Sequence, residues 1–391
     1  MSKNLPKIVI IMPTYNEAEN ITRMVDVLFE EEFPRIKEAQ MHLLVVDDNS
    51  PDGTGDIVKK KQMKYKNLHL LQGEKAGLGK AYVRGFKYAM QDLKADATLE
   101  MDSDFQHDPK HVKAMVQAFL SGADYVIGSR YIKGGSIPAG WAIYRKAISF
   151  FGNLYARLVL WLPSLHDTTT GFRLTRVKGV LNKIDLDNLM ELHRFAFKVD
   201  LFYQSAKLSK NTVEVPIHFA QRTQEKSKFS LAEMVATYKV VMLLRLRASK
   251  KFIKFAIVGF LGFVVNFVFL RVFRSLGFGE VLVWLFATEL AIINNYVLNN
   301  IWTFKEKKIG GIKKTINKFV QFNLTSAGAL VIQSILGPLG VYFVGAKYDW
   351  LVLLLVVGFF VMPYNYFMYN AVIWKTWHLP GPLGKLQKLA K

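Results

Sequence analysis

The chain has 391 residues, a formal net charge of +21, 51% hydrophobic and 13% aromatic residues, and no cysteine. This length predicts two or more domains, and the hydrophobic content is high for a wholly soluble protein. The lack of cysteine excludes disulfides, thiolate metal sites and a cysteine nucleophile. Lysine and arginine gather beside long apolar stretches, which argues against a nucleic-acid-binding protein and favours contact with a membrane or phosphorylated ligands.

Short apolar runs in the N-terminal half predict strands that alternate with helices. The runs at 8–12 and 43–46 each lead into a polar segment and then a helical pattern, and a third run ends just before Asp102. This alternation predicts an α/β domain. Ligands of open α/β sheets bind outside the carboxyl ends of the strands, so the three polar corners predict one crevice.

The third corner carries two aspartates one residue apart, Asp102 and Asp104, followed by Gln106. Because strand side chains repeat every two residues, we expect these three oxygen donors to converge on one divalent cation, Mg²⁺ or Mn²⁺. Paired carboxylates also occur on solvated turns, so the pattern alone is weak evidence for a metal site.

Four long apolar segments in the C-terminal part predict helices that span a membrane: 252–273, 281–304, 319–344 and 350–374. The second contains Glu289. An ionisable group within a span is a candidate functional residue, and a polar contact between helices or subunits explains it equally well.

The distribution of basic residues predicts the orientation of the spans. Lysines and arginines are concentrated at 245–254, 305–318 and 375–391, which border the same side of the four predicted spans. The positive-inside rule therefore places both termini and the N-terminal domain in the cytoplasm. The first residues lead directly into a strand, so we expect no signal peptide there.

Two further segments, 141–162 and 231–249, mix apolar and aromatic side chains with cationic edges. Helices of this kind can lie in the plane of the lipid headgroups, although periodicity does not separate them from ordinary core helices. The predicted domains are then a catalytic domain at 1–230, the interfacial helix at 231–249, the membrane domain at 250–376 and a basic cytoplasmic tail at 377–391.

Several motifs together resemble the polyprenol (dolichol) phosphate mannose synthases, which are inverting glycosyltransferases of the GT-A fold. The matching strings are Pro13-Thr14-Tyr15-Asn16-Glu17, Asp47-Asp48-Asn49-Ser50-Pro51-Asp52-Gly53-Thr54, Gly77-Leu78-Gly79-Lys80-Ala81-Tyr82, Met101-Asp102-Ser103-Asp104, Gly128-Ser129-Arg130-Tyr131 and Ser227-Lys228. The segment 250–376 is similar to the four-helix GtrA-like membrane domain. The resemblance therefore implies a GT-A (Rossmann-like) α/β domain followed by an all-α transmembrane domain.

The resemblance also implies roles for individual residues. For the donor, it implies a guanosine site at Pro13, Tyr15, Glu17, Val46 and Asp48, and a diphosphate and metal site at Asp102, Ser103, Asp104 and Gln106. It also implies a loop that closes over the diphosphate through Arg222 and Lys228. For the acceptor phosphate, it implies a site at Arg130, Arg145 and Ser149, with Arg130 also near the donor. The expected partners are GDP-mannose, a polyprenyl or dolichyl phosphate and the bilayer, and a homo-oligomer through the membrane domain is left open.

Other residues carry weaker expectations. Glu100 is expected to occupy a hydrogen-bonded niche rather than to bind metal, because an unpaired buried carboxylate is costly. Asp167 and Asp200 are candidates for orienting the sugar. Lys75 and Lys80 flank the glycine-rich loop and are candidates for meeting phosphate, although the glycines favour an ordinary turn. The eight histidines show no metal-ligand spacing, and His107 is expected at a turn.

The acceptor phosphate is itself a charged nucleophile, because the second pKa of such a monoester is about 6. No general base is then required, and cations must offset the repulsion between two anionic reactants. In-line attack predicts inversion to a β-linked product.

Three other functions fit part of the sequence. A glucose synthase that uses UDP-glucose is the nearest, a flippase would leave the nucleotide corner unused, and a processive polysaccharide synthase would carry an Arg-Trp dipeptide, which does not occur here.

Overall fold

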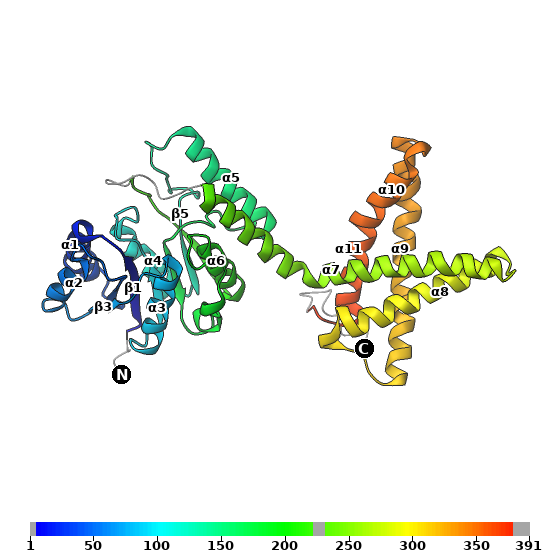
Figure 1. The fold of residues 1–391 in the computed structure, drawn as a ribbon, viewed down its shortest axis with the longest axis horizontal. Helices are drawn as coiled ribbons and strands as arrows, with labels where there is room; N and C mark the ends of the chain where they lie inside the picture. The colour runs from blue at the N-terminus through cyan, green and yellow to red at the C-terminus, as the bar shows by residue number, and fades with distance from the viewer. Residues whose placement is uncertain (1–4, 222–230, 378–391) are drawn as a thin grey trace. The chain divides into compact units, whose positions relative to one another are not determined.

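The structure, a computed structural model, describes residues 5–221 and 231–377 (Figure 1). The chain divides into two compact units, Met1–Leu246 and Arg247–Lys391. The first contains a seven-stranded sheet with helices on both faces, and the second contains helices alone among its described residues. The predicted α/β domain followed by an all-α domain is confirmed.

The sheet has the strand order β3-β2-β1-β4-β6-β5-β7. Neighbouring strands are parallel except at β6, which runs antiparallel to both β4 and β5. Residues that form these strands are rich in Val, Ile and Leu, as expected for a sheet covered on both faces. The strands are β1 (Lys7–Thr14), β2 (Gln40–Asp47), β3 (Leu68–Gln72), β4 (Ala97–Glu100), β5 (Tyr125–Ser129), β6 (Arg173–Arg176) and β7 (Thr212–Pro216).

Alternate residues of β1 enter two different cores. Ile8, Ile10 and Met12 pack with residues of α1, α2 and α4, whereas Val9 and Ile11 pack with residues of α3 and α6. This alternation follows from the period of two along a strand and gives a three-layer domain. The helices of this unit are α1 (Ala18–Asp26), α2 (Thr54–Gln62), α3 (Leu78–Gln91), α4 (Val112–Leu120), α5 (Ile143–Val159) and α6 (Phe197–Leu208).

A third apolar cluster joins α5 and α6 to the first part of α7 (Leu231–Ser275). Tyr155 of α5 stacks on Tyr238 of α7, with ring centroids 4.9 Å apart. Both helices also carry outward apolar side chains: Phe151 is 62% exposed and Val235 is 60% exposed. The segments predicted as 231–249 and 252–273 thus belong to one continuous helix of 45 residues.

The second unit is built from the rest of α7 and from long helices that follow it. They are α8 (Glu280–Leu298), α9 (Ile312–Val344), α10 (Asp349–Val356) and α11 (Met362–Met368), and π-helical turns extend α8 to Thr303 and join α10 and α11 as far as Ile373. Three helices are long and apolar enough to cross a membrane: Leu231–Ser275, Val281–Thr303 and Leu354–Ile373. The fourth predicted span, 319–344, lies in α9, where only Ile335–Val344 qualifies as a shorter apolar helix among the described residues.

One asparagine connects the ends of several helices in this unit. Asn300, only 8% exposed, donates to the carbonyl of Ile309, and its Oδ1 accepts from Ile309 N at 2.7 Å and from Trp374 Nε1 at 3.1 Å. The Trp374 ring also stacks on Phe304 with centroids 4.3 Å apart. A buried amide with its donor and acceptor satisfied fixes the register of these segments.

Alanine substitutions at two helical glycines are expected to change the free energy of unfolding in opposite directions. A Cβ at Gly85 of α3 would lie 2.6 Å from Ile11 Cγ2 and 2.9 Å from Val46 Cγ2, whereas a Cβ at Gly152 of α5 meets nothing within 4 Å. Gly85→Ala is expected to lower the free energy of unfolding by about 1–3 kcal/mol through overpacking. Gly152→Ala is expected to raise it by about 0.5–1 kcal/mol, since glycine is unfavourable in a helix. Denaturant unfolding of the solubilised full-length protein checks both signs, and stabilisation by Gly85→Ala would contradict the packing of α3 on the sheet.

Candidate active site

The ends of β1 and β2 form a corner that two aspartates, the buried Asp47 and the exposed Asp52, hold together. Asp47, which is fully buried, accepts hydrogen bonds from Thr14 Oγ1 at 3.1 Å and from the amide and hydroxyl of Ser50 at 3.0 and 2.6 Å. Asp52 accepts from the amide of Ala18 and from both the amide and hydroxyl of Thr54. These two aspartates of the motif therefore shape the loop rather than offer free ligands.

Asp48 is the aspartate of this corner that a cation engages. Its Oδ1 accepts from Arg84 Nη2 of α3 at 2.6 Å. Burial raises the pKa of the Asp48 carboxyl above its ordinary value, although Arg84 opposes the shift. Nearby, Lys75 Nζ lies 3.4 Å from the centroid of the Tyr15 ring, so it contributes a cation to this corner.

The remaining residues predicted to bind the nucleotide lie at the same sheet edge, with one difference. Pro13, Tyr15 and Glu17 are half-buried around the end of β1. The side chain of Val46 is fully buried and packs in the core with α3. A base at this edge could therefore reach only the main chain of Val46.

The aspartate pair does not lie on a strand, so the prediction that strand alternation aligns it is wrong. β4 ends at Glu100, and the next residues form bends, with Phe105 at φ 60°. Asp104 Oδ1 accepts from the amide of Gln106 at 3.1 Å, which closes a local turn. The pair remains at the carboxyl end of β4, next to β1, because Met101 N donates to Ile11 O.

Asp102 rests on a layer of buried polar groups. Its Oδ1 accepts from the Tyr82 hydroxyl at 3.1 Å and lies 3.6 Å from Lys198 Nζ, while its amide donates to His107 Nδ1 at 3.2 Å. Burial is the largest single influence and raises the pKa of the Asp102 carboxyl, but Lys198, His107 and the Tyr82 hydroxyl together outweigh it, so the pKa lies below its ordinary value. Burial lowers the pKa of His107 to about 4, so this histidine is a neutral, buried acceptor rather than an exposed turn residue.

Glu100 is buried with charges around it, and the expected hydrogen-bonded niche is not what the structure shows. Among the described residues, neither oxygen of Glu100 has a hydrogen-bond partner, and Arg173 Nε lies 3.7 Å from Oε1. Burial raises the pKa of Glu100, and the cations Arg173 and Lys198 oppose the shift. Glu100 is thus compensated by charge rather than by direct hydrogen bonds.

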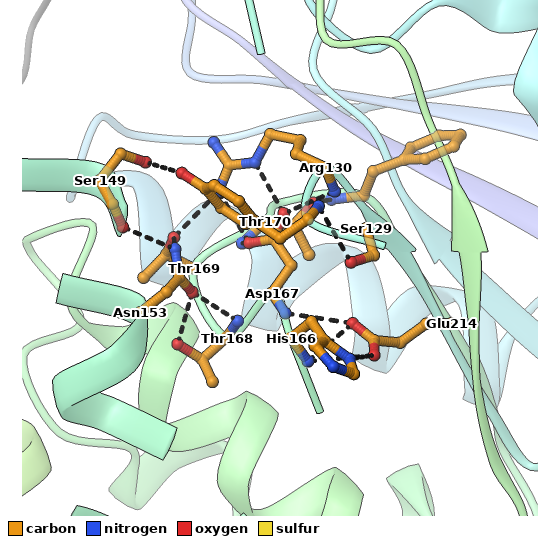
Figure 2. Close-up of polar contacts among 12 residues, drawn as sticks. Ser129, Arg130, Ser149, Asn153, His166, Asp167, Thr168, Thr169, Thr170 and Glu214 are labelled. Atoms are coloured by element: carbon orange, nitrogen blue, oxygen red, sulfur yellow. Dashed lines mark hydrogen bonds and ion pairs between the residues drawn. The ribbon is translucent and has the colours of Figure 1, made fainter. Parts of the chain in front are cut away.

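Arg130, at the end of β5, is held rigidly by a carboxylate (Figure 2). Its Nε and Nη2 donate to the two oxygens of Asp167, both at 2.7 Å, and Nη2 also donates to Thr169 Oγ1 at 3.0 Å. Glu214 of β7 in turn accepts from the amides of His166 and Asp167 and lies 2.7 Å from His166 Nδ1. Within the described part of the chain, these bonds leave Nη1 of Arg130 available to a ligand.

The predicted acceptor residues of α5 adjoin this group. Tyr131, next to Arg130, donates its hydroxyl proton to Ser149 Oγ at 2.6 Å, and Asn153 donates to Thr169 (Figure 2). Burial lowers the pKa of the Arg145 guanidinium, and the positive charge of Arg130 contributes to this shift. Tyr131 thus links the end of β5 to Ser149, and Arg145 lies one helical turn before Ser149 on α5.

The predictions for Asp200 as a sugar-orienting residue and for the loop with Arg222 and Lys228 remain. Asp200 accepts from the Met190 amide and from the Gln204 side chain, so it supports a loop and a helix. Arg222 and Lys228 lie outside the residues that the structure describes.

The aspartate pair fits a metal site in which the protein supplies only one or two carboxylates. Within residues 5–221 and 231–377, no three His, Asp or Glu side chains cluster closely enough to hold an ion. Asp102 keeps 35% of its side chain exposed and Asp104 follows it at the same strand end. One or two carboxylates suit a cation such as Mg²⁺ whose remaining ligands are water and substrate phosphates.

Comparisons with known proteins agree with this geometry. Residues 9–181 match the family described as Glycosyl transferase family 2, and residues 254–374 match GtrA/DPMS, transmembrane domain. A dolichol-phosphate mannosyltransferase of Pyrococcus furiosus is 34% identical over 341 residues, which cover 84% of this chain and 89% of that protein. The chain belongs to the polyprenol-phosphate mannosyltransferases of glycosyl transferase family 2.

Two further relatives match a shorter part of the enzyme. An undecaprenyl-phosphate mannosyltransferase of Micrococcus luteus is 38% identical over 227 residues, covering 57% of this chain and 88% of that protein. A polyprenol monophosphomannose synthase of Mycolicibacterium smegmatis is 37% identical over 225 residues, covering 56% and 80%. The enzyme is therefore a glycosyltransferase joined to a transmembrane domain, as the motifs predicted.

Several residues of the site were not found from the sequence. They are Tyr82, Arg84, Tyr131, Asn153, His166, Lys198 and Glu214. Tyr82 and Tyr131 stand in motif strings but had no assigned role, and most of the others give no sequence signal, because their partners lie far away along the chain. Lys198 does give one, since it stands between Phe197 and Val199 on a helix whose neighbouring residues are buried.

The pairing of Arg130 with Asp167 predicts a large stability cost for a small change. Asp167→Asn keeps the shape of the side chain but leaves a buried guanidinium without its counter-charge, and is expected to cost about 3–5 kcal/mol in the free energy of unfolding. The matched control is Asp187→Asn, whose carboxylate is 66% exposed and pairs with Lys87, with an expected cost of about 0–1 kcal/mol. Urea unfolding of the full-length enzyme measures both, and equal costs would contradict a rigid Arg130.

Proposed function

We propose that the enzyme transfers mannose from GDP-mannose to a polyprenyl or dolichyl phosphate, with inversion, to give a β-linked polyprenyl phosphate mannose. The observation that carries the proposal is the match to the Pyrococcus furiosus dolichol-phosphate mannosyltransferase, because it extends over 84% of the chain. The named relatives all transfer mannose to isoprenoid phosphates, which supports this acceptor class.

The donor would bind along the ends of β1, β2 and β4. Asp48, fixed by Arg84, supplies an acceptor for the guanosine, and Tyr15 with Lys75 lines the same corner. Asp102, Asp104 and Gln106 would hold a Mg²⁺ or Mn²⁺ ion with the donor diphosphate. Such an ion offsets the charge that develops on the departing nucleoside diphosphate.

The acceptor phosphate would bind at Arg130, Arg145 and Ser149. Its monoester is largely ionised at neutral pH, so the residues need to orient it rather than remove a proton. Arg130 is locked by Asp167 in one rotamer, and a rigid cation stabilises charge without reorganising during the reaction.

The isoprenoid chain and the membrane would meet the enzyme at the exposed apolar faces of α5 and the first part of α7. Ile143 and Leu158 of α5 and Leu231 of α7 are each at least 64% exposed. Such faces suit the plane of the lipid headgroups. We place the catalytic unit and both termini on the cytoplasmic side, with α9 as the fourth span, because basic residues gather at that side of the spans.

A direct assay tests this function. Purified enzyme with dolichyl phosphate and Mg²⁺ or Mn²⁺ is expected to form an alkali-stable or acid-labile lipid product from labelled GDP-mannose, with a β-linkage by NMR. Excess chelator is expected to abolish turnover. Faster turnover with labelled UDP-glucose would identify a glucose synthase instead, and a retained α-linkage would contradict in-line attack.

Sealed membrane vesicles extend the assay to the orientation. GDP-mannose does not cross a bilayer, so inside-out vesicles are expected to incorporate mannose and right-side-out vesicles to do so only after detergent is added. The reverse result would place the catalytic unit on the other face.

Replacement of Arg145 distinguishes a role in acceptor binding from a role in donor binding. Arg145→Ala is expected to raise the KM for polyprenyl phosphate about tenfold, the value of one charge-assisted contact, with little change in the KM for the donor. Arg157→Ala removes a second arginine of α5, roughly 18 Å further along the helix, and is the matched control. A larger change in the donor KM would show that Arg145 serves the nucleotide instead.

A further inference from the structure

Four charged groups of alternating sign extend from the protein interior to the aspartate pair. Arg173 of β6 lies beside Glu100 of β4, and both side chains are at most 2% exposed. Lys198 of α6, fully buried, lies 3.6 Å from Asp102 Oδ1. The order of charges from inside outward is therefore positive, negative, positive, negative.

Lys198 is fixed at the base of Asp102 and does not reach the solvent. Its ammonium lies 3.5 Å from the Tyr82 hydroxyl and 4.8 Å from the centroid of the Tyr82 ring. A Cβ added at Gly171 would lie 2.5 Å from Lys198 Nζ, so the glycine leaves the space that the ammonium occupies. A buried lysine in this position acts on substrates only through Asp102.

A positive charge at this place opposes the binding of a second cation. An ion bound by Asp102 would lie within several ångströms of Lys198, and repulsion at that distance is large even at an effective dielectric constant of about 20. Glu100 offsets part of the lysine charge from behind. The affinity of the aspartate pair for metal thus depends on two buried residues that do not bind the metal.

We infer that Lys198 is a built-in cation that weakens the binding of a free divalent ion at Asp102, so that the ion binds tightly only together with the donor diphosphate. Lys198 is then a positioning residue that tunes the site, and Glu100 acts in the opposite sense. This inference rests on the metal site of the proposed function.

Binding of Mn²⁺ alone to the chelator-treated, full-length enzyme tests the inference, with free Mn²⁺ followed by electron paramagnetic resonance. Lys198→Met is expected to lower the Kd for Mn²⁺ about tenfold or more, since a neutral side chain removes the repulsion. Glu100→Gln is expected to raise the Kd, because the lysine charge is then less compensated. A purely structural role would weaken binding in both variants, so an unchanged or higher Kd in Lys198→Met overturns the inference.

Two controls separate this result from other causes. Lys207→Met removes an exposed lysine of the same helix, roughly 13 Å further along, and is expected to leave the Kd unchanged. Asp104→Ala is expected to abolish Mn²⁺ binding. If Asp104→Ala binds as the wild type does, the proposed metal site itself is wrong, whereas loss there with no change in Lys198→Met overturns this inference alone.

The inference remains testable if one of the variants does not fold. Thermal unfolding reports whether each variant is folded, and if Lys198→Met is not, a Kd that fails to rise in Glu100→Gln overturns the inference.

Discussion

The parallel hydrogen bonding of β2, β1 and β4 is the constraint on which the site depends. The register pairs Thr14 with Asp47 and Ile11 with Glu100, so the chain leaves all three strands at the same edge. Each strand is followed by polar residues that could not remain in the sheet interior. The loop after β2 is then tied to the start of α1 by Asp52, and the nucleotide corner and the aspartate pair become neighbours although they are about 50 residues apart.

Compensation of buried charge is the second feature that shapes this enzyme. Arg130 is neutralised by Asp167, whose own backbone is held by Glu214, and Asp102 is neutralised by Lys198. Both arrangements place the compensating group behind a residue of the proposed substrate site. A site that receives two phosphate esters needs cations and anions in fixed places, because water is a poor source of oriented charge once substrates exclude it.

In the membrane unit, the positions of the helices are fixed by other interactions than ion pairs. Its described helices expose many large apolar side chains, and its packing relies on aromatic stacking and on buried amides such as Asn300. Polar side chains hold such helices in register where lipid offers no hydrogen bonds. Because α7 is continuous from Leu231 to Ser275, the same helix that packs on α5 and α6 also enters this unit.

The sequence by itself determined the class of fold, the presence of a helical membrane domain and the family. Apolar runs with periods of two and 3.6, and a motif string such as that from Asp47 to Thr54, are local signals that need no knowledge of distant contacts. Local reasoning misjudged the segment after Glu100, where bends replace the strand, and the environment of Glu100 and His107. It also missed Lys198 and Glu214 as parts of the site. Only the tertiary structure decided these, because a buried charge is stable where a partner from elsewhere in the chain faces it, and one sequence position does not name that partner.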